Sequence, residues 1–543
     1  MEFNIAQIHE AIAEQIPDRE CIVFRDRRWT WAQVTERTRR LANFLLSRGL
    51  GIRAERSTLQ GWESGQSHLA LYLYNGNEYL EGMLGAYKAR VAPFNVNYRY
   101  VEDELLYLLR DSRADGIVYH AVFAPVLDKV RAALPDLKVL IQVPDDSGNA
   151  LLAGAVDYEA ALRDASRERP AVQWSPDDLY ILYTGGTTGM PKGVLWRQAD
   201  AAVAALQLRR RDGPEYTVLD EIVANAVAAR GHRVMPSPPF MHGAAHWAAF
   251  ANFIAGNAVV IQSDPARLDP HDLLSTVERE QVGAMLIVGD AFARPLLDQL
   301  SKRSYDLSSL RVMVTGGAAL NPSYKRQILE KLPDLRIVDS IGSSESGTQG
   351  AHVSTVQAGV ATGTFMPNPG TCILSEDMTR VLEPGHTELG WFATSGRVPL
   401  GYFGDPQKTA KTFPVIAGTR YSVPGDRARQ RADRSIEVHG RDSVTINSGG
   451  EKIFAEEIEQ VLRAHPAVYD AVVAGRPSER WGQEVVALVS LRPGHSATAA
   501  ELIEECSRHL ARYKLPKEVR FMGEIVRSPN GKADYRWAKE QAS

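Results

Sequence analysis

Residues 183–193 combine four glycines and three threonines with one lysine, directly after an apolar run at 180–182. Glycine accepts positive φ and lets backbone amides approach an anion, while threonine hydroxyls add hydrogen-bond donors. The segment is not a Walker A loop, because glycine rather than serine or threonine follows its lysine. A flexible surface turn is the alternative. We predict instead a phosphate-binding loop made of Thr184, Gly185, Gly186, Thr187, Thr188, Gly189 and Lys192.

Three later segments place glycine beside hydroxyl or acidic residues, at 315–320, 339–345 and 421–426. The first follows an expected strand at 311–314, where a Gly-Gly turn alone is weak evidence. In the second, Glu345 follows a run of serine and glycine, and a carboxylate oxygen is a ligand that Mg²⁺ prefers. A single Gly-Asp or Gly-Arg pair carries no information. The pairs at 425–426 and 440–441 are informative only because of their order and spacing relative to the other segments.

In their order, these segments resemble the motifs of the adenylate-forming superfamily, which includes acyl-CoA synthetases, peptide-synthetase adenylation domains and beetle luciferases. The resemblance covers nearly the whole chain. It implies ATP as a substrate and extends the ATP-binding set beyond the first loop. The added residues are Gly316, Gly317, Ala318, Asp339, Ser340, Ile341, Gly342, Ser344, Asp426, Arg441 and Lys532.

The resemblance also implies the residues that act on the phosphates. Glu345, supported by Thr184, is expected to hold Mg²⁺ against ATP. Lys532, in a Pro-Asn-Gly-Lys loop, is expected to bridge the substrate carboxylate and the α-phosphate, where a lysine ammonium compensates negative charge. A solvated lysine near the C-terminus is the alternative. Ile341 stands where many members carry tyrosine, so adenine would stack on an aliphatic side chain.

The segment 238–243 resembles the part of the family that lines the acyl pocket. It implies His242, Gly243 and Gly317 as substrate-binding residues, and His242 joins Lys532, Glu345 and Thr184 in the catalytic set. A structural role for His242 stays open. No acidic residue occurs at 236–251, where amino-acid adenylation domains typically carry an aspartate for the substrate ammonium. The segment therefore argues against an amino-acid substrate.

The resemblance also implies a hinge and CoA-binding residues in the C-terminal part of the chain. By resemblance, Ser443 occupies a hinge position, and Gly449 and Gly450 line the pantetheine tunnel of CoA after a domain rotation. A plain β-turn at 449–450 is equally consistent with the sequence.

Hydrophobic patterning predicts the elements that must position these residues. Short β-branched runs alternate with longer amphipathic stretches up to about residue 440, which is typical of βα units with largely parallel sheets. Residues 244–261 should form a buried helix, a Gly-Asn turn and a strand. Beyond 440 the pattern becomes a compact α+β unit, long enough for a domain.

We therefore expect an α/β fold with two domains. A large N-terminal domain, 1–440, holds several subdomains with mostly parallel sheets and, by resemblance, a distorted barrel. A small mobile α+β domain, 441–543, carries the hinge and Lys532.

Composition excludes several other classes of protein. Hydrophobic residues make up 44% and charged residues 24%, so disorder is not the dominant state. The 62 basic and 66 acidic residues give a net charge of −4, which favours neither nucleic acid nor an anionic membrane. Three distant cysteines form no zinc or disulfide pattern, and no signal peptide or transmembrane run is evident. We expect a cytoplasmic protein; a homodimer stays open.

These features predict an ATP-dependent, AMP-forming acid–CoA ligase that uses ATP, Mg²⁺ and CoA on a small-molecule carboxylic acid. Segments 95–100, 289–295, 341–345 and 534–540 resemble the subgroup that activates long-chain acids and steroid side-chain carboxylates. An apolar acid is therefore expected. Two alternatives remain: an adenylating enzyme that passes its acyl group to a carrier-protein thiol or oxidises it, and a non-catalytic nucleotide-binding protein.

Overall fold

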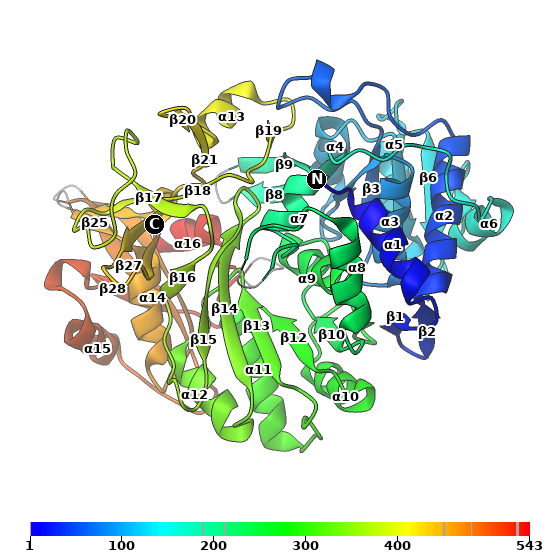
Figure 1. The fold of residues 1–543 in the computed structure, drawn as a ribbon. Helices are drawn as coiled ribbons and strands as arrows, with labels where there is room; N and C mark the ends of the chain where they lie inside the picture. Colours follow the sequence, from blue (N-terminus) through cyan, green and yellow to red (C-terminus); the bar gives the residue numbers. More distant parts are fainter. Residues whose placement is uncertain (1, 187–188, 211–212, 449–450, 479–480, 528–531) are drawn as a thin grey trace.

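The computed structural model describes residues 2–543 except 187–188, 211–212, 449–450, 479–480 and 528–531 (Figure 1). Thr187, Thr188, Gly449 and Gly450 therefore lie outside the described residues, as does the side chain of Ser443. Among the described residues, no helix has the length and apolar character needed to cross a membrane.

A five-stranded parallel sheet occupies the first part of the chain (Figure 1). Its central strands are buried along almost their whole length, as expected for a parallel sheet covered by helices on both faces. The strand order is β4 (Ala92–Asn95), β3 (His68–Tyr72), β5 (Gly116–His120), β6 (Val139–Val143) and β7 (Val156–Asp157). The helices are α2 (Trp31–Ser47), α3 (Asn77–Lys88) and α6 (Tyr158–Asp164) on one face, and α4 (Glu102–Asp111) and α5 (Ala124–Arg131) on the other.

A second sheet of fifteen strands runs through the middle of the molecule. Its parallel part is β1 (Glu20–Phe24), β11 (Ala258–Ile261), β10 (Arg233–Pro236), β12 (Ala284–Ile287), β13 (Val312–Gly316) and β14 (Arg336–Ser343), with β2 (Arg27–Thr30) antiparallel at the edge. The helices of this region are α1 (Ile5–Gln15), α7 (Gln198–Ala204), α8 (Leu219–Ala228), α9 (Gly243–Ile254), α10 (Pro270–Glu280), α11 (Gly289–Lys302) and α12 (Pro322–Lys331). The helix, turn and strand predicted at 244–261 are confirmed by α9, Gly256 with φ of 70°, and β11.

The same sheet continues in antiparallel strands and does not close on itself within the described residues. β15 pairs with β16, and β16 pairs with β23, so these strands extend the large sheet. The expected distorted barrel is therefore corrected to an open mixed sheet. The strands are β15 (Gly347–Ser354), β16 (Thr364–Pro367), β23 (Ile436–Arg441), β22 (Asp426–Gln430), β18 (Gly390–Ser395), β21 (Thr419–Ser422), β20 (Val415–Ile416) and β17 (Thr371–Leu374), with helix α13 (Pro406–Thr412).

The glycine- and threonine-rich segment belongs to the two strands of a β-hairpin, apart from residues 187–188, which lie outside the described residues. β8 (Leu179–Gly186) and β9 (Gly189–Arg197) pair antiparallel, with Thr184 opposite Lys192. β19 (Gly401–Tyr402) pairs with β9 and completes a three-stranded sheet.

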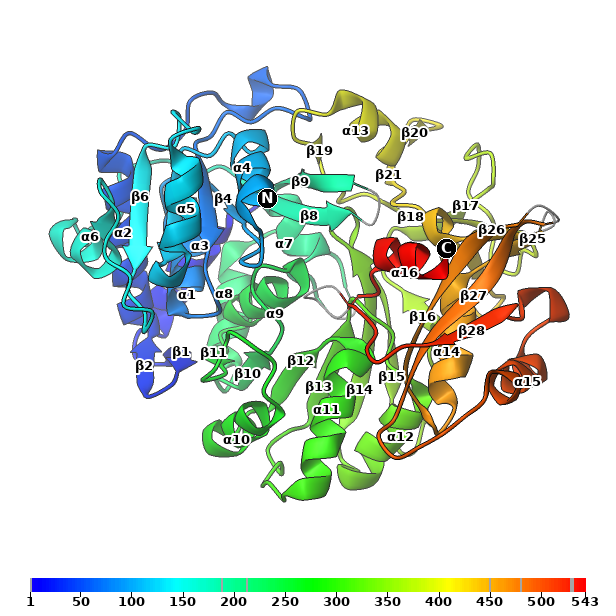
Figure 2. The ribbon, with the colours of Figure 1, turned by 180° about the vertical axis from the view of Figure 1, so that it is seen from behind.

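The C-terminal residues form a separate five-stranded sheet beside the large one (Figure 2). Here apolar positions of two long paired strands pack on two helices, which buries a compact core. The elements are β24 (Ile446–Ser448), β25 (Glu451–Ile453), α14 (Ala455–Ala464), β26 (Val468–Ser478), β27 (Gly482–Leu491), α15 (Ala499–His509), β28 (Glu518–Phe521) and α16 (Tyr535–Ala542). Short 3₁₀ turns are η1 (Arg56–Thr58), η2 (Ala121–Phe123), η3 (Asp442–Val444) and η4 (Arg512–Lys514).

Candidate functional site

The predicted nucleotide residues follow the carboxyl ends of neighbouring parallel strands. β13 and β14 pair in register, with Thr315 opposite Asp339 and Gly316 opposite Ser340. In open α/β sheets this edge is where ligands bind, because the loops after adjacent strands lie side by side. Gly317 has φ of 80°, in the left-handed region that favours glycine. The geometry thus gathers two of the predicted segments at one edge of the sheet.

The turn that carries Glu345 is fixed by contacts from three other elements. The Tyr402 hydroxyl donates to Oε1 of Glu345 at 2.8 Å, and the Ser422 hydroxyl donates to its backbone carbonyl at 2.6 Å. Trp196 Nε1 donates to the carbonyl of Ser344 at 2.9 Å. Since Trp196 lies on β9 and Tyr402 on β19, these bonds tie the hairpin sheet to the turn that carries Glu345.

Strand β14, near its end, has no space for a side chain at residue 342. A Cβ on Gly342 would lie 2.1 Å from the carbonyl oxygen of Gly347. Ile341 packs its side chain against the apolar cluster beneath the sheet. Asp339 is also engaged, because Lys325 Nζ donates to its Oδ2 at 2.7 Å. Burial raises the pKa of Asp339 despite this partner.

Asp426 and Arg441 face each other across β22 and β23. Arg441 Nε lies 3.4 Å from Asp426 Oδ1, and the two residues are direct neighbours in the strand register. The charge of Asp426 raises the pKa of Arg441 despite burial. Gly440, with φ of 130°, packs against the C-terminal unit, since a Cβ there would lie 2.6 Å from Glu456 Oε2.

Lys532 reaches this site from the opposite end of the chain. A Cβ built on Gly317 would lie 3.8 Å from Cε of Lys532. Part of the Lys532 side chain is exposed, but desolvation by the surrounding protein atoms lowers the pKa of its ammonium. The charge of Arg441 lowers that pKa further, whereas Glu345 and Asp426 oppose the shift. The ammonium therefore lies among the predicted nucleotide residues.

Lys192 of the hairpin is engaged by an acid that the sequence did not reveal. Its Nζ lies 3.0 Å from Oδ1 of Asp111, at the end of α4. The Tyr183 hydroxyl donates to Oδ2 of the same carboxylate at 3.0 Å. Asp111 therefore connects the two strands of the hairpin just below its tip.

Two asparagines anchor the segment that precedes His242. Asn75 donates to the carbonyl of Pro238 at 3.0 Å and accepts from the Phe240 amide at 2.6 Å. Asn95 donates to the carbonyls of Met241 and Tyr183, at 2.7 Å and 2.8 Å. These bonds fix the segment 238–242 against the end of β8, next to the hairpin.

His242 is a neutral group in this environment. Burial lowers the pKa of its imidazole to about 3, and the charge of Lys532 adds to this effect. Its Nε2 is buried and has no hydrogen-bond partner among the described residues. The ring can therefore accept or donate one hydrogen bond, but it supplies no positive charge at neutral pH.

Sequence reasoning missed the residues that hold the motifs in place. Three of them lie outside the segments on which the site prediction depended: Asn75, Asp111 and Tyr402. Ser422 lies within one of these segments, but no role was predicted for it.

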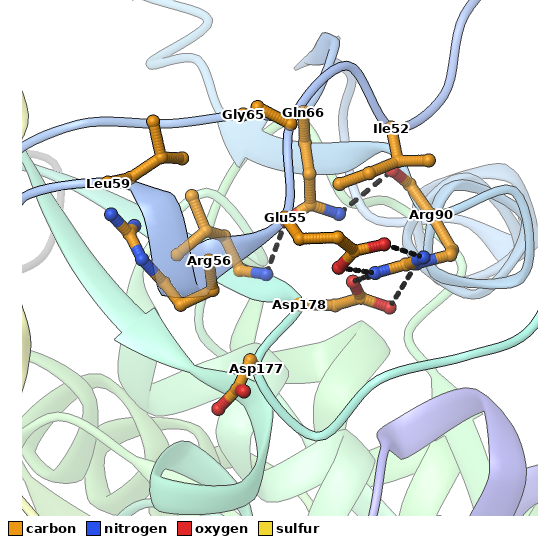
Figure 3. A pocket seen from close by; sticks show the side chains of 11 residues that line it. Ile52, Glu55, Arg56, Leu59, Gly65, Gln66, Arg90, Asp177 and Asp178 are labelled. Atoms are coloured by element: carbon orange, nitrogen blue, oxygen red, sulfur yellow. Dashed lines mark hydrogen bonds and ion pairs between the residues drawn. The ribbon is translucent and has the colours of Figure 1, made fainter.

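A charged cluster elsewhere is not a ligand site: Arg90 fills the pocket shown in Figure 3 with ion pairs to Glu55 and Asp178. That pocket leaves about 10 Å³, which suffices for roughly one water molecule.

Comparison with known proteins places this geometry in a family. The AMP-binding enzyme profile matches residues 9–402, and the profile of the AMP-binding enzyme C-terminal domain matches residues 457–532. The chain is 55% identical to the medium-chain acyl-CoA ligase Mig of Mycobacterium avium, over 99% of this chain and 98% of that protein. It is 39% identical to the 3-oxocholest-4-en-26-oate–CoA ligase of Rhodococcus rhodochrous, over 100% and 96%.

A solved structure supports the same fold. The anthranilate CoA ligase AuaEII, in complex with anthranoyl-AMP, superposes with a TM-score of 0.83 and 22% identity, over 100% of this chain and 97% of that one. The predicted enzyme class, an AMP-forming acid–thiol ligase, is confirmed by the family and its relatives. The chain therefore belongs to the AMP-binding enzyme family, within the adenylate-forming superfamily that its motifs resemble.

Proposed function

We propose that the chain is an acyl-CoA ligase that activates an apolar carboxylic acid with ATP and passes the acyl group to CoA. The observation that carries this proposal is the approach of Lys532 to Gly317, where the charges of Glu345, Asp426 and Arg441 act on its ammonium. Groups from both ends of the chain thereby surround one position at the sheet edge. A nucleotide there would meet an ammonium, a guanidinium and two carboxylates.

In the first half-reaction, a carboxylate oxygen of the acid bonds to the α-phosphorus of ATP, and the bond from that phosphorus to pyrophosphate breaks. Two anions must approach one another, so positioning and charge compensation do most of the work. Lys532 is the group we assign to that compensation. Arg441 and Asp426 are assigned to the nucleotide, together with the tip of the β8–β9 hairpin.

Glu345 is the residue that would hold Mg²⁺, with Thr184 in support. Its carboxylate is a hard oxygen donor, and the Tyr402 hydroxyl bond at 2.8 Å orients it. The described residues contain no group of three or more His, Cys, Asp or Glu that could form a metal cage. A single carboxylate fits Mg²⁺ in such sites, because the ion is commonly shared between one or two carboxylates and substrate phosphates.

In the second half-reaction, the CoA sulfur bonds to the acyl carbon, the bond to AMP breaks and the thiol proton is lost. A thiol has a reference pKa of about 8.5, so a small fraction is thiolate at neutral pH. Ser443 remains our proposed hinge, and Gly449 and Gly450 remain the proposed CoA contacts.

The boundary between the two domains is proposed near residue 440, since β23 ends at Arg441 and the small sheet begins at Ile446.

The names of the relatives support an apolar acid as substrate. The relative at 55% identity is named for medium-chain acids. A relative at 40% identity, from Mycobacterium marinum, is named for medium- and long-chain fatty acids and for 3-oxocholest-4-en-26-oate. We therefore place a medium-chain fatty acid first and a long-chain or steroid acid next. A panel from acetate to steroid acids, followed by pyrophosphate release with CoA or carrier protein as acceptor, tests this order.

Replacing Lys532 with alanine tests the assignment of the first half-reaction. Lys532→Ala should lower acid-dependent pyrophosphate release by about 100-fold or more, as expected when a charge-compensating donor is lost. Thioester formation from supplied acyl-adenylate should persist. Lys539→Ala, on the exposed face of α16, is the matched control and should change neither rate. Equal losses in both half-reactions would contradict the assigned role of Lys532.

A further inference from the structure

A cluster of five charged side chains lies where the C-terminal unit meets the large domain. We call it the border cluster: Asp290 and Arg294 on α11, Arg463 on α14, Asp470 on β26, and Arg527. Arg294 Nη2 lies 3.8 Å from Asp470 Oδ2, and Arg463 Nε lies 3.9 Å from Asp290 Oδ2. Each of these two contacts joins the two parts of the chain. The members are buried, with between 5% and 15% of each side chain exposed.

One side of the border cluster leads directly to Lys532. Arg527 donates to Asp470 through Nε and Nη2, both at 2.7 Å. The backbone of Arg527 forms an antiparallel bridge with Ala533, the residue after Lys532. Asp470 therefore fixes the base of the short segment that carries the lysine.

The other side of the cluster leads to Gly317. One carboxylate oxygen of Asp290 accepts from the Asn321 amide at 2.7 Å, and the Asp290 amide donates to the carbonyl of Ala319 at 3.3 Å. Asp290 thus braces the loop that begins at Gly317. The same residue faces Arg463 of the C-terminal unit. The loop that begins at Gly317 and the segment that carries Lys532 are therefore both held by side chains of the border cluster.

Arg294 is the member that connects the two sides most closely. Its guanidinium carbon lies 3.8 Å from the centre of the Tyr469 ring, and its Nη1 donates to the carbonyl of Tyr469. Burial would raise the pKa of Asp470, but the bonds from Arg527 and the charges of Arg463 and Arg294 outweigh it and lower the pKa. Asp470 is therefore ionised among cations near neutral pH.

We propose that the border cluster, acting through Arg294 and Asp470, positions Lys532 against Gly317 for adenylate formation. Buried ion pairs add little net stability, because desolvation offsets attraction, but they can favour one arrangement of the parts. We treat them as positioning residues, because the contacts described above join them to one another and to neighbouring backbone. The inference rests on the proposed function of Lys532 in the first half-reaction.

The test separates the two half-reactions in the full-length enzyme. Arg294→Met keeps the length and apolar stem of the side chain and removes its charge. We expect pyrophosphate release to fall about tenfold, in line with coupling energies between contacting residues. Thioester formation from supplied acyl-adenylate should be unchanged or faster, which also reports that the variant is folded. Arg294→Lys should recover part of the loss, and Asp470→Asn should reproduce it.

Tyr324→Phe is the matched control. It removes one hydrogen bond across the same border, in which Arg492 donates to the Tyr324 hydroxyl at 2.7 Å, and leaves every side chain of the border cluster in place. Both half-reactions should stay near wild type in this control. Equal losses of both half-reactions in Arg294→Met, or no loss of either, would overturn the inference.

Backbone hydrogen exchange gives a reading that needs no substrate. If the cluster holds the two parts together, the amides of residues 317–321 should exchange faster in Arg294→Met and Asp470→Asn than in wild type or Tyr324→Phe. Unchanged exchange would overturn the inference. By contrast, wild-type enzyme that releases no pyrophosphate with any acid of the panel would count against the proposed function alone.

Discussion

Two clusters of arginine and carboxylate differ in how their charges are shared. In the pocket of Figure 3, one arginine serves two carboxylates: Arg90 donates to Asp178 at 2.8 Å and to Glu55 at 2.8 Å. In the border cluster, one carboxylate serves several arginines, because Asp470 faces Arg527 and Arg294. The key residue is a cation in the first cluster and an anion in the second.

This difference is visible in the two aspartates. Burial raises the pKa of Asp178, and the charge of Glu55 adds to the rise, so the single Arg90 does not offset both effects. Burial also acts on Asp470, but several cations lower its pKa. The Arg90 cluster joins segments of the large domain only, whereas the border cluster joins that domain to the unit that carries Lys532. We therefore expect the first to act on stability and the second on the balance between half-reactions.

The largest expected effect comes from removing Arg90. Arg90→Met leaves Asp178, with 1% of its side chain exposed, as a buried carboxylate without its cation. The free energy of unfolding should fall by about 3–5 kcal/mol, as found when one partner of a buried pair is removed. Urea unfolding measures this change. In enzyme that remains folded, both half-reactions should stay near wild type; a selective loss of adenylate formation would contradict the contrast between the clusters.

A smaller and pH-dependent effect is expected from Glu456, which also lies at the border. Burial, with the charges of Glu459 and Asp426, raises its pKa from 4.5 to about 8. The folded protein therefore favours the protonated acid, and the free energy of unfolding falls as pH rises from about 4.5 to about 8. Glu456→Gln should remove this loss and raise the free energy of unfolding by about 1–3 kcal/mol at pH 8, with little gain at pH 5.

The neighbouring residue supplies a control of opposite sign for this prediction. Glu457 lies 3.3 Å from His439 and also pairs with Lys514, and these partners lower its pKa although burial opposes them. Glu457→Gln should therefore lower stability near neutral pH, and its effect should vanish as the pH falls below the usual pKa of the acid. Thermal unfolding of both variants between pH 3 and 9 measures the two signs and the loss of the Glu457→Gln effect at low pH. A gain for both variants would contradict the assigned pKa shifts.

Several motifs could be predicted from sequence because a glycine-rich segment lies at the end of an apolar strand, as at β8 and β13. Gly342 illustrates why the residue type matters, since a side chain there would meet the carbonyl oxygen of Gly347 at 2.1 Å. The alternation of strands and helices likewise follows from hydrophobic periodicity. The expected barrel was wrong because strand pairing decides closure, and β16 pairs with β23 to extend the sheet.

The partners of the motifs could not be predicted, because they are selected by tertiary packing and carry no local pattern. Tyr402 is 57 residues from Glu345, and Asp111 is 81 residues from Lys192. The border cluster has the same character: Arg294 and Asp470 are separated by most of a domain, and a charged residue on a helix or strand is usually solvated. Only the fold brings these side chains together.

The smallest expected effect comes from Glu55, the second acid of the Arg90 cluster. Its side chain is 58% exposed, so water solvates much of its charge. Arg90 lowers the pKa of Glu55, but at an exposed position this interaction adds little stability. Glu55→Gln should lower the free energy of unfolding by less than about 1 kcal/mol, and less at high salt, as is typical of exposed ion pairs. Urea unfolding at low and high ionic strength measures this. An equal loss in the free energy of unfolding for Glu55→Gln and Arg90→Met would contradict this argument. The stabilising effect of Arg90 would then come from its exposed partner Glu55 and not from the buried Asp178.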